Sequence, residues 1–484
     1  MNAIARTFPV IPEMVKLARA IQAAGGRPLL VGGWVRDCLL GHPHSKDFDV
    51  EVFGIDPRTL HKVLQRFGPV HEVGRHFGVL KVATASAEYD VSVPRRESKT
   101  GKGHKGFWVA TDPHMTFADA AARRDFTLNS MGYALLDEEF LDPFGGEQDL
   151  RLRVLRHVGT SFGEDPLRVL RAMQFAGRFG LSIAEETLAI CRTQDLHELP
   201  RERMWEEFRK LLLRSPKPSV GLAYAPELGV LPYFPELEAL YRAASGAGQP
   251  APWQRMLAVL DAAAALRPAH DEDALVFMLA ALGHSLGRSA GHAKEGPAKD
   301  KDGARSAAAL AQAAAHAAAA ATERLLLRLT NEQALVERVC ALVRELPLVD
   351  AAGDLRDGDL RRLSLRVPLP TLAGLATALH GARMAPGAPA GMARGGGPPA
   401  ASCPAAATLR ARAEALGVWT QPPEPLLKGR HLLEAGMRPG PRMGHLLRLA
   451  FERQLDGDLR TLDDAVGWMR RELNAPAATA EDAP

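Results

Sequence analysis

The stretch that decides the fold of the N-terminal part is residues 30–50, LVGGWVRDCLLGHPHSKDFDV. An apolar run leads into Gly32 and Gly33, and a second apolar run is interleaved with two aspartates, Asp47 and Asp49. A strand that ends in two glycines before a helix lets backbone N–H groups approach an anion at the helix N-terminus, where the dipole also favours negative charge. Taken alone, a double glycine in this position is more often only a tight turn.

The two aspartates give the stretch a more specific meaning. On a strand, positions i and i+2 fall on one face, about 7 Å apart at ~3.3 Å per residue. Two carboxylates so placed can share hard cations, and two Mg²⁺ ions about 4 Å apart would serve an in-line attack on a nucleotide phosphate. The alternative is that Asp47 caps a turn and Asp49 is a solvated strand residue. A third carboxylate, Asp90 in EYDVSVPRRE, favours the metal site because a neighbouring strand could present it to the same ions.

Composition limits the classes of protein that remain. The length of 484 residues allows several domains, and a net charge of +3 means that any nucleic acid must be held by local basic patches. No run of about 18 apolar residues occurs, and the first 25 residues predict an amphipathic helix rather than a signal peptide. We therefore expect a soluble protein of the cytoplasm without a membrane partner. The cysteines are too far apart for zinc ribbons or a disulfide framework, which fits a reducing compartment: Cys38, Cys191, Cys340 and Cys403.

The pattern along the chain changes near residue 160. Residues 28–155 alternate β-rich and helical runs, as in an α/β domain, whereas the later residues predict helices. Two stretches interrupt the helical part. Residues 287–320 are alanine-rich with a charged front, and we expect a flexible segment that runs into a helix. Residues 382–408 are rich in Ala, Gly and Pro and predict a disordered insertion.

Six motifs occur in an order that resembles a known family. They are GGWVRDCLLG, DFD, YDVSVPRRE, RRDFTLNS (123–130), DPFGG (142–146) and EDPLRVLR (164–171). This order resembles the class II tRNA nucleotidyltransferases, the CCA-adding enzymes of the polymerase β superfamily, which are close relatives of bacterial poly(A) polymerases. Residues 426–457 look like the C-terminal region of the same family. The resemblance implies an α+β chain, with a polymerase β-like head of mixed sheet and helices at 1–155, then an all-α neck (156–220), body (221–345) and tail (346–484).

The resemblance also implies the site residues. Asp47 and Asp49 would be ligands of two Mg²⁺ ions and would form the catalytic group with Asp90. Asp165 and Arg168 match positions that read the base, since a carboxylate acceptor beside a guanidinium donor can imitate the edge of a partner base. The alternative for Asp165 is the N-cap of a helix, and both roles can hold. The nucleotide, CTP or ATP, would be held by Gly32, Gly33, Arg36, Arg124, Asp125, Asn129, Asp165, Arg168 and Arg171.

Basic runs suit an RNA partner, which the resemblance implies to be the acceptor stem and 3′ end of tRNA. Residues 95–105 match a flexible loop of the family and carry Arg95, Arg96, Lys99, Lys102 and Lys105. Residues 151–178 and 201–217 are further basic runs, for which charged solvent faces of ordinary helices are the alternative. Such patches supply salt-dependent phosphate contacts that do not read sequence.

One run departs from the family. Many bacterial relatives carry a phosphohydrolase motif of His followed by Asp, and the corresponding run here, FMLAALGHSLG, places Ser285 after His284. Because one ligand type is missing, we expect His284 to be a packed helical histidine in a degenerate region, and we expect no metal-dependent phosphatase activity.

The resemblance thus implies template-independent addition of CMP, CMP and AMP to the 3′ end of tRNA, with release of pyrophosphate. Two alternatives stay open. One is a poly(A) polymerase, or an enzyme that adds only A or only C, although the spacing within residues 156–180 looks closer to CCA-adding enzymes. The other is a catalytically inactive nucleotide- or RNA-binding module, which the presence of all three carboxylates disfavours.

Overall fold

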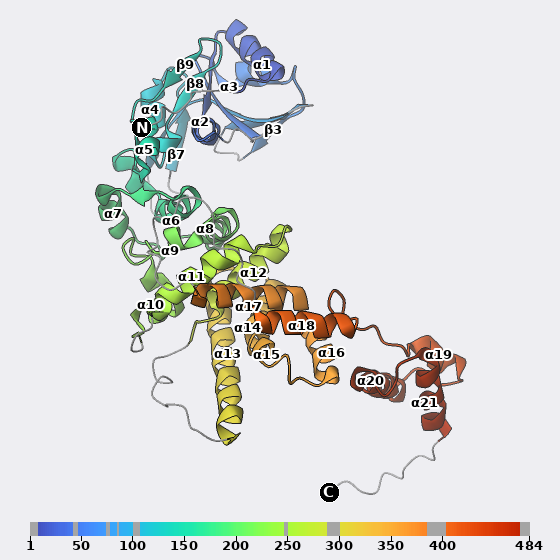
Figure 1. The fold of residues 1–484 in the computed structure, drawn as a ribbon. Coiled ribbons are helices and arrows are strands. Elements are labelled where there is room, and N and C mark those ends of the chain that lie inside the picture. Colours follow the sequence, from blue (N-terminus) through green and yellow to red (C-terminus); the bar gives the residue numbers. More distant parts are fainter. Residues whose placement is uncertain are drawn as a thin grey trace. The chain divides into compact units, whose positions relative to one another are not determined.

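The computed structural model describes residues 8–41, 47–73, 78–84, 87–99, 107–245, 250–287, 301–384 and 403–474. The chain forms two compact units, Met1–Tyr233 and Phe234–Pro484. The first unit contains a mixed sheet and helices, and every named element of the second unit is a helix (Figure 1). The predicted α+β fold class is confirmed. The predicted boundaries at residues 155, 220 and 345 stay predictions.

The head contains a seven-stranded sheet with the order β3-β4-β5-β2-β1-β8-β9. Strand β2 lies at its centre, antiparallel to β1 and parallel to β5. The sequence pattern predicted β-rich runs at β1, β2, β4 and β5 and a further run at residues 141–144, which overlaps β9 only at Leu141; the short strands β3 and β8 were not expected. The strands are β1 (Arg27–Val31), β2 (Asp47–Phe53), β3 (Val70–Val73), β4 (Val79–Ala83), β5 (Glu88–Ser92), β8 (Gly132–Ala134) and β9 (Glu139–Leu141).

Alternation along β2 separates the two faces of the sheet. Phe48 and Val50 are buried, and the Phe48 ring contacts Trp34 of α2 (Gly33–Leu39) with 5.9 Å between centroids. Asp49 and Glu51 alternate with them and therefore lie on the opposite face. A slip of one residue in the register would move the two acids into the core, so the apolar face fixes where the acids emerge. The amphipathic helix predicted near the N-terminus is confirmed as α1 (Pro12–Ala23), whose apolar side is buried.

The remaining elements of the first unit lead from the sheet into helices. Helix α6 (Leu167–Phe179) packs on α8 (Arg201–Arg214) and α9 (Pro218–Leu222). The others are α3 (Pro57–Leu64), β6 (Arg95–Lys99), β7 (Phe107–Thr111), α4 (Phe117–Ala121), α5 (Gly146–Leu152), β10 (Val154–Leu155), β11 (Ser182–Ile183), α7 (Glu185–Arg192) and the 3₁₀ turns η1 (Thr127–Asn129), η2 (Thr160–Glu164) and η3 (Leu231–Tyr233).

The second unit is built around helix α12, in which residues 274–283 are all buried. A separate apolar cluster near the C-terminus joins α19, α20 and α21, with Leu432 and Trp468 among its buried residues. Among the described residues, no helix is both long enough and apolar enough to cross a membrane. The helices are α10 (Pro235–Arg242), α11 (Pro252–Ala265), α12 (Asp271–Gly283), α13 (Lys301–Leu329), α14 (Gln333–Glu345), α15 (Pro347–Asp350), α16 (Asp357–Arg366), α17 (Leu369–Met384), α18 (Pro404–Ala415), α19 (Gly429–Glu434), α20 (Pro441–Asp456) and α21 (Leu462–Asn474).

The two low-complexity stretches end in helices. The helix expected within residues 287–320 is confirmed as α13, which begins at Lys301, while residues 288–300 lie outside the described part. The prediction of a disordered insertion at residues 382–408 is wrong at both ends of that range, because α17 continues to Met384 and α18 begins at Pro404. Proline at the first helical position and burial of Leu409 explain the second boundary. Residues 385–402 lie outside the described part.

The prediction of a flexible basic loop at residues 95–105 is wrong for its first five residues. Arg95–Lys99 forms strand β6, which pairs antiparallel with β7 at Phe107–Thr111. The partner strand is rich in aromatic and β-branched residues, which favour the extended conformation whatever the charge of the opposite strand. Residues 100–106, with Lys102 and Lys105, lie outside the described part.

We predict that Gly221→Ala destabilises the first unit, because α9 approaches α6 closely at this residue. A Cβ on Gly221 would lie 2.2 Å from the carbonyl oxygen of Met173, which belongs to the helix backbone. Overpacking of this kind costs about 1–3 kcal/mol. Gly159→Ala is the matched control, because no atom lies within 4 Å of the added carbon and its φ of −172° is extended. Urea unfolding of both variants measures the difference, and equal midpoints would contradict the prediction.

Candidate nucleotide-binding site

Two of the three predicted catalytic acids lie side by side on the sheet. Strands β2 and β5 are parallel, and their register makes Asp49 the partner of Asp90. Paired residues of neighbouring strands project from the same face. The carboxylate of Asp90 also accepts from Lys81 of β4, with an Nζ–Oδ1 distance of 3.1 Å. The backbone of Asp47 opens β2 opposite Glu88, but its side chain lies outside the described part.

Gly32 lets a guanidinium and a carboxylate meet over the backbone. Its φ of +72° is a conformation that L side chains rarely adopt. A Cβ at this position would lie 3.1 Å from Nη1 of Arg124 and 3.6 Å from Oδ2 of Asp49. A Cβ on the next glycine, Gly33, would lie 3.4 Å from Nη2 of Arg36. The predicted phosphate turn therefore lies close to one acid, Asp49, and to two guanidinium groups, those of Arg124 and Arg36.

Arg124 is held at the turn by two hydrogen bonds. Its Nη2 donates to Oε2 of Glu51 at 3.2 Å, and its Nη1 donates to the carbonyl of Asn129 at 3.1 Å. Sequence reasoning missed Glu51, although the i, i+2 alternation of Asp47 and Asp49 continues to it in DFDVE. The result is a guanidinium placed next to a carboxylate face, with its side chain 23% exposed.

Four of the residues predicted to contact the nucleotide, Arg36, Asp125, Asn129 and Arg171, are joined in one hydrogen-bond network. Asp125 accepts from Nδ2 of Asn129 at 3.0 Å and from Nε of Arg171 at 2.7 Å. Asn129 in turn accepts from Nη1 of Arg36 at 2.7 Å, and Arg36 also pairs with Asp37 at 2.7 Å. Arg36, Asp125 and Asn129 are each less than a tenth exposed. These side chains stabilise the site from within the protein.

Burial and pairing set the protonation states of this network. Burial by itself raises the pKa of Asp125, but Arg171 and the hydrogen bonds from Asn129 and Phe126 outweigh it and hold that pKa below its usual value. Asp125 is therefore ionised at neutral pH. Burial lowers the pKa of Arg36, an effect that Asp37 opposes. Burial raises the pKa of the neighbouring Cys38 thiol to about 12, so this thiol is protonated at neutral pH and is a poor nucleophile.

The predicted pair at the start of α6, Asp165 and Arg168, is held by other partners. Asp165 accepts from the Leu167 N–H at 3.1 Å, as the capping alternative expects, and from Nη2 of Arg203 at 2.8 Å. Arg168 donates to the carbonyls of Ser161 and Arg123, both at 2.7 Å. Sequence reasoning did not connect Arg203 with Asp165, because Arg203 belongs to α8, far along the chain.

The basic residues of the predicted loop are only partly described. Arg96 pairs with Asp112 across the β6–β7 hairpin at 2.8 Å, and the carbonyl of Arg95 accepts from Arg123 at 3.2 Å. The side chain of Lys99 lies outside the described part, as do Lys102 and Lys105.

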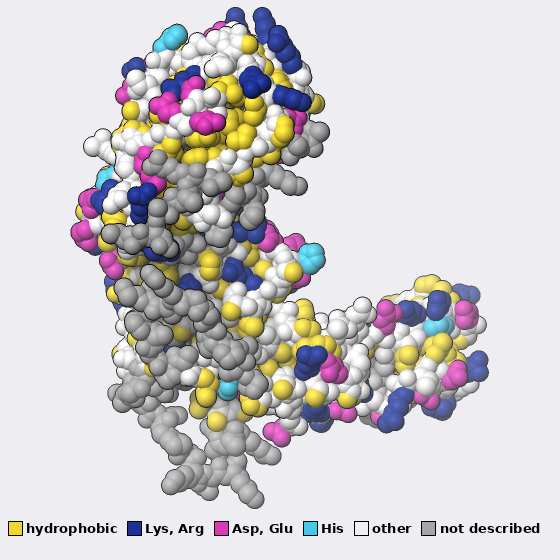
Figure 2. Space-filling model, turned by 45° about the horizontal axis from the view of Figure 1, so that its top comes forward, with side chains coloured by type: hydrophobic (Ala, Val, Ile, Leu, Met, Phe, Trp, Pro, Cys, Tyr) yellow, Lys and Arg dark blue, Asp and Glu magenta, His cyan; other side chains and the backbone are white. Residues whose placement is uncertain are grey.

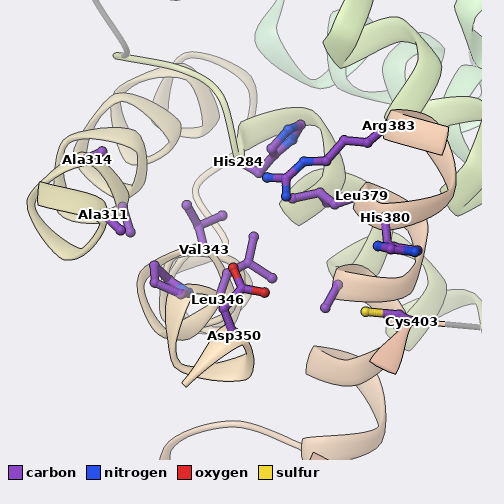
Figure 3. A pocket seen from close by; sticks show the side chains of 13 residues that line it. His284, Ala311, Ala314, Val343, Leu346, Asp350, Leu379, His380, Arg383 and Cys403 are labelled. Atoms are coloured by element: carbon purple, nitrogen blue, oxygen red, sulfur yellow. The ribbon is translucent and has the colours of Figure 1, made fainter. Parts of the chain in front are cut away.

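His284 lies in the second unit, directly after α12. Its Nδ1 is 2.7 Å from the carbonyl of Ala281, and its side chain lines a pocket of about 150 Å³ together with Asp350, His380 and Arg383 (Figure 3). Among the residues that the structure describes, no three His, Cys, Asp or Glu side chains form a group that could hold a metal ion. The described residues include those that line this pocket and the pair Asp49 and Asp90, but not the side chain of Asp47.

Two family models match segments within residues 29–241. Residues 29–156 match the poly(A) polymerase head domain, and residues 180–241 match the probable RNA and SrmB-binding site of polymerase A.

Solved structures identify the fold. The Bacillus stearothermophilus CCA-adding enzyme in complex with CTP matches with a TM-score of 0.63 and 22% identity, over 96% of this chain and 98% of that chain. The Thermotoga maritima CCA-adding enzyme complexed with tRNA_CCA matches with a TM-score of 0.58 and 17% identity, over 97% of each chain. The fold is that of the CCA-adding enzymes.

Similarity to curated proteins places the chain in one family. The multifunctional CCA protein of Stenotrophomonas maltophilia is 41% identical over 288 residues, which cover 55% of this chain and 66% of that protein. The protein of the same name from Nitrosococcus oceani is 36% identical over 351 residues, covering 70% and 79%. The match thus spans slightly less than two thirds of the first relative and over three quarters of the second. The chain belongs to the family of the multifunctional CCA proteins.

We predict that Arg171→Met costs about 3 kcal/mol of unfolding free energy at about pH 7, because it leaves the Asp125 carboxylate buried without its cation. The double variant Arg171→Met/Asp125→Asn should recover part of this loss, since it also removes the charge. Urea unfolding provides the measurement.

The same pair predicts a pH dependence. The pKa of Asp125 is below the ordinary 3.8 in the folded wild type, so its stabilisation is complete above that value and is lost as the pH falls through the lower, folded-state pKa. In Arg171→Met the Asp125 carboxylate has lost its cation and is protonated more readily. Protonation in acid removes the buried charge and with it the cost in unfolding free energy. The stability gap between the two proteins should therefore shrink between about pH 7 and about pH 4. A gap that widens towards acid would contradict the assignment.

Proposed function

We propose that this protein adds CMP, CMP and AMP to the 3′ end of tRNA, using CTP and ATP without a nucleic-acid template. The observation that carries the proposal is the parallel register of Asp49 and Asp90, next to Arg124 at the Gly32 turn, in a chain of the multifunctional CCA protein family. The 3′ hydroxyl of the terminal ribose loses its proton to solvent and its oxygen forms a bond to the α-phosphorus, while the bond between the α-phosphorus and the oxygen bridging to the β-phosphate breaks and pyrophosphate leaves.

The acid face fits Mg²⁺ by its chemistry. Asp49 and Asp90 provide carboxylate oxygens on one face of the sheet, the donor type that hard cations take, and Asp47 begins the same strand. In this proposal Asp47 and Asp49 hold the metal, with Asp90 beside them. When bound, Mg²⁺ would lower the pKa of the attacking hydroxyl and neutralise charge on the triphosphate.

In this proposal, one residue near the acids contacts the triphosphate and three others hold that surface in place. Arg124, partly exposed beside Gly32, is placed to meet the triphosphate, and a planar guanidinium suits bidentate contact with phosphate oxygens. Arg36, Asp125 and Asn129 support that surface through their buried hydrogen bonds. Positioning and charge stabilisation account for this transfer without a covalent intermediate.

The base would be read at the start of α6. CTP and ATP both present an exocyclic amino donor beside a ring-nitrogen acceptor, whereas UTP and GTP present the opposite pattern. A carboxylate accepts from the first group and a guanidinium donates to the second. Asp165 is partly exposed. Arg168 donates one hydrogen bond from Nη1 and one from Nη2, whereas a guanidinium has five N–H donors. Both can therefore make further contacts with a base.

Transfer RNA is the acceptor that the family and the charge distribution suggest. The net charge of +3 is small, and on the face shown in Figure 2 lysine and arginine side chains are interspersed with acidic ones. Such a surface would hold RNA by local phosphate contacts and by shape rather than by a strong overall field. All four cysteines are free and buried, which fits a cytoplasmic protein.

A second candidate is a poly(A) polymerase, which the match of residues 29–156 to the poly(A) polymerase head domain favours. One experiment separates the two. The protein and Mg²⁺ are incubated with a tRNA transcript that lacks its last three nucleotides, with CTP, ATP or both, and the 3′ ends are sequenced. Ends that stop at CCA only when both nucleotides are present support CCA addition. Long A tracts with ATP alone would support the polymerase, and unextended ends would refute both.

We predict that Asp49→Asn and Asp90→Asn each lower nucleotide incorporation by at least about 100-fold, because each removes a charged oxygen ligand from the acid face. Binding of tRNA should change by less than about twofold, since the substitutions lie on the acid face and not on a basic run. Glu72→Gln is the matched control, because Glu72 is an exposed acid on β3 of the same sheet. Single-turnover incorporation and filter binding measure the two effects, and unchanged incorporation in the Asp49 variant would overturn the site.

A further inference from the structure

We infer that Phe179 is a positioning residue that couples the glycine turn to the helix carrying the base-reading pair, and so contributes to nucleotide specificity. The inference rests on the proposed function. Phe179 is the last residue of α6 and lies outside the six sequence motifs. The guanidinium of Arg36, in α2, lies over its ring with the Cζ atom 4.4 Å from the ring centroid.

Arg36 is the link between the two helices. It follows Gly33 by three residues in α2, is 4% exposed, and lies 5.5 Å from the ring of Phe175 as well as over Phe179. Cation–π contacts strengthen when the cation is desolvated. The same guanidinium donates to Asn129 and to Asp37, so any rotation that optimises one partner weakens another.

A second connection reaches α6 about two turns away. Arg36 donates to Asn129, Asn129 donates to Asp125, and Arg171 of α6 donates to Asp125. Arg171 and Phe179 are eight residues apart, or about 12 Å along the helix at 1.5 Å per residue. Together with the packing of α6 on α8 and α9, two anchors at that separation hold the direction of α6 relative to α2.

The direction of α6 matters because the two ends of a nucleotide bind at different elements. The triphosphate would lie at the Gly32 turn, and the base would lie at Asp165 and Arg168, at the opposite end of α6 from Phe179. A tilt of α6 about the Arg171 anchor moves its first turn relative to the glycine turn. Misplacement of base-reading groups by about 1 Å is enough to weaken selective contacts strongly. Phe179 therefore acts on base selection through Arg36 without touching the nucleotide.

The test compares three variants in the full chain. Phe179→Leu keeps an apolar side chain but removes the ring face, Phe179→Tyr keeps the ring face, and Phe140→Leu makes the same change at a partly buried aromatic of β9 outside the network. For Phe179→Leu we expect the KM for CTP and for ATP to rise by about threefold to tenfold, as loss of a desolvated cation–π contact implies. Misincorporation of UMP should rise as well, while kcat and tRNA affinity change by less than about twofold. Phe179→Tyr and Phe140→Leu should behave as the wild type.

A measurement without turnover separates this inference from the proposed function. Amide hydrogen exchange of the nucleotide-free protein reports the local opening of α2, residues 33–39. Exchange in α2 should be faster in Phe179→Leu, although the substitution is in α6, and unchanged in the other two variants. A wild type that incorporates no nucleotide would refute the function and leave the coupling to be decided by exchange. Unchanged exchange in α2, or a loss of kcat with unchanged KM and unchanged UMP misincorporation, would overturn the coupling.

Discussion

The site depends on one constraint, the parallel pairing of β2 with β5. Alternating residues of β2 are buried on one face, and the register with β5 places Asp49 opposite Asp90 on the other. Because the side-chain period of a strand is two, the burial of Phe48 and Val50 determines where the acids emerge. The hydrophobic core therefore fixes the position of a charged surface without contacting it.

The charged groups near that surface have two environments with different consequences. Asp49 is exposed and Asp90 is partly exposed, so both carboxylates can exchange partners with water, substrate or cations. Arg36 and Asp125 are buried and bonded within the protein, where an unpaired charge would be costly. The exposed groups are suited to chemistry, and the buried groups are suited to holding the turn and α6 in place.

The sequence predicted the parts of this arrangement that are local or motif-bound. The strand carrying Asp47 and Asp49, the neighbouring strand with Asp90, and the α+β order of the chain follow from alternation and motif order. The partners of the predicted residues could not be predicted, because they depend on contacts between segments far apart in sequence. Arg203 meets Asp165 across 38 residues, and Asn129 meets Arg36 across 93. Composition also failed at residues 95–99, where backbone pairing with a β-rich strand produced a strand from a basic segment.

Buried pairing also limits how Arg36 and Asn129 can act in catalysis. A guanidinium that donates to Asn129 and Asp37 and lies over the Phe179 ring has its electrostatic partners inside the protein, so reaching a triphosphate would require it to break several contacts at once. Arg124 also has hydrogen-bond partners, Glu51 and the carbonyl of Asn129, but it lies at the glycine turn with about a quarter of its side chain exposed, so a phosphate can approach it without the loss of a buried network. In the proposed function, direct phosphate contact is therefore assigned to Arg124, and Arg36 is assigned the support of the glycine turn from within the protein.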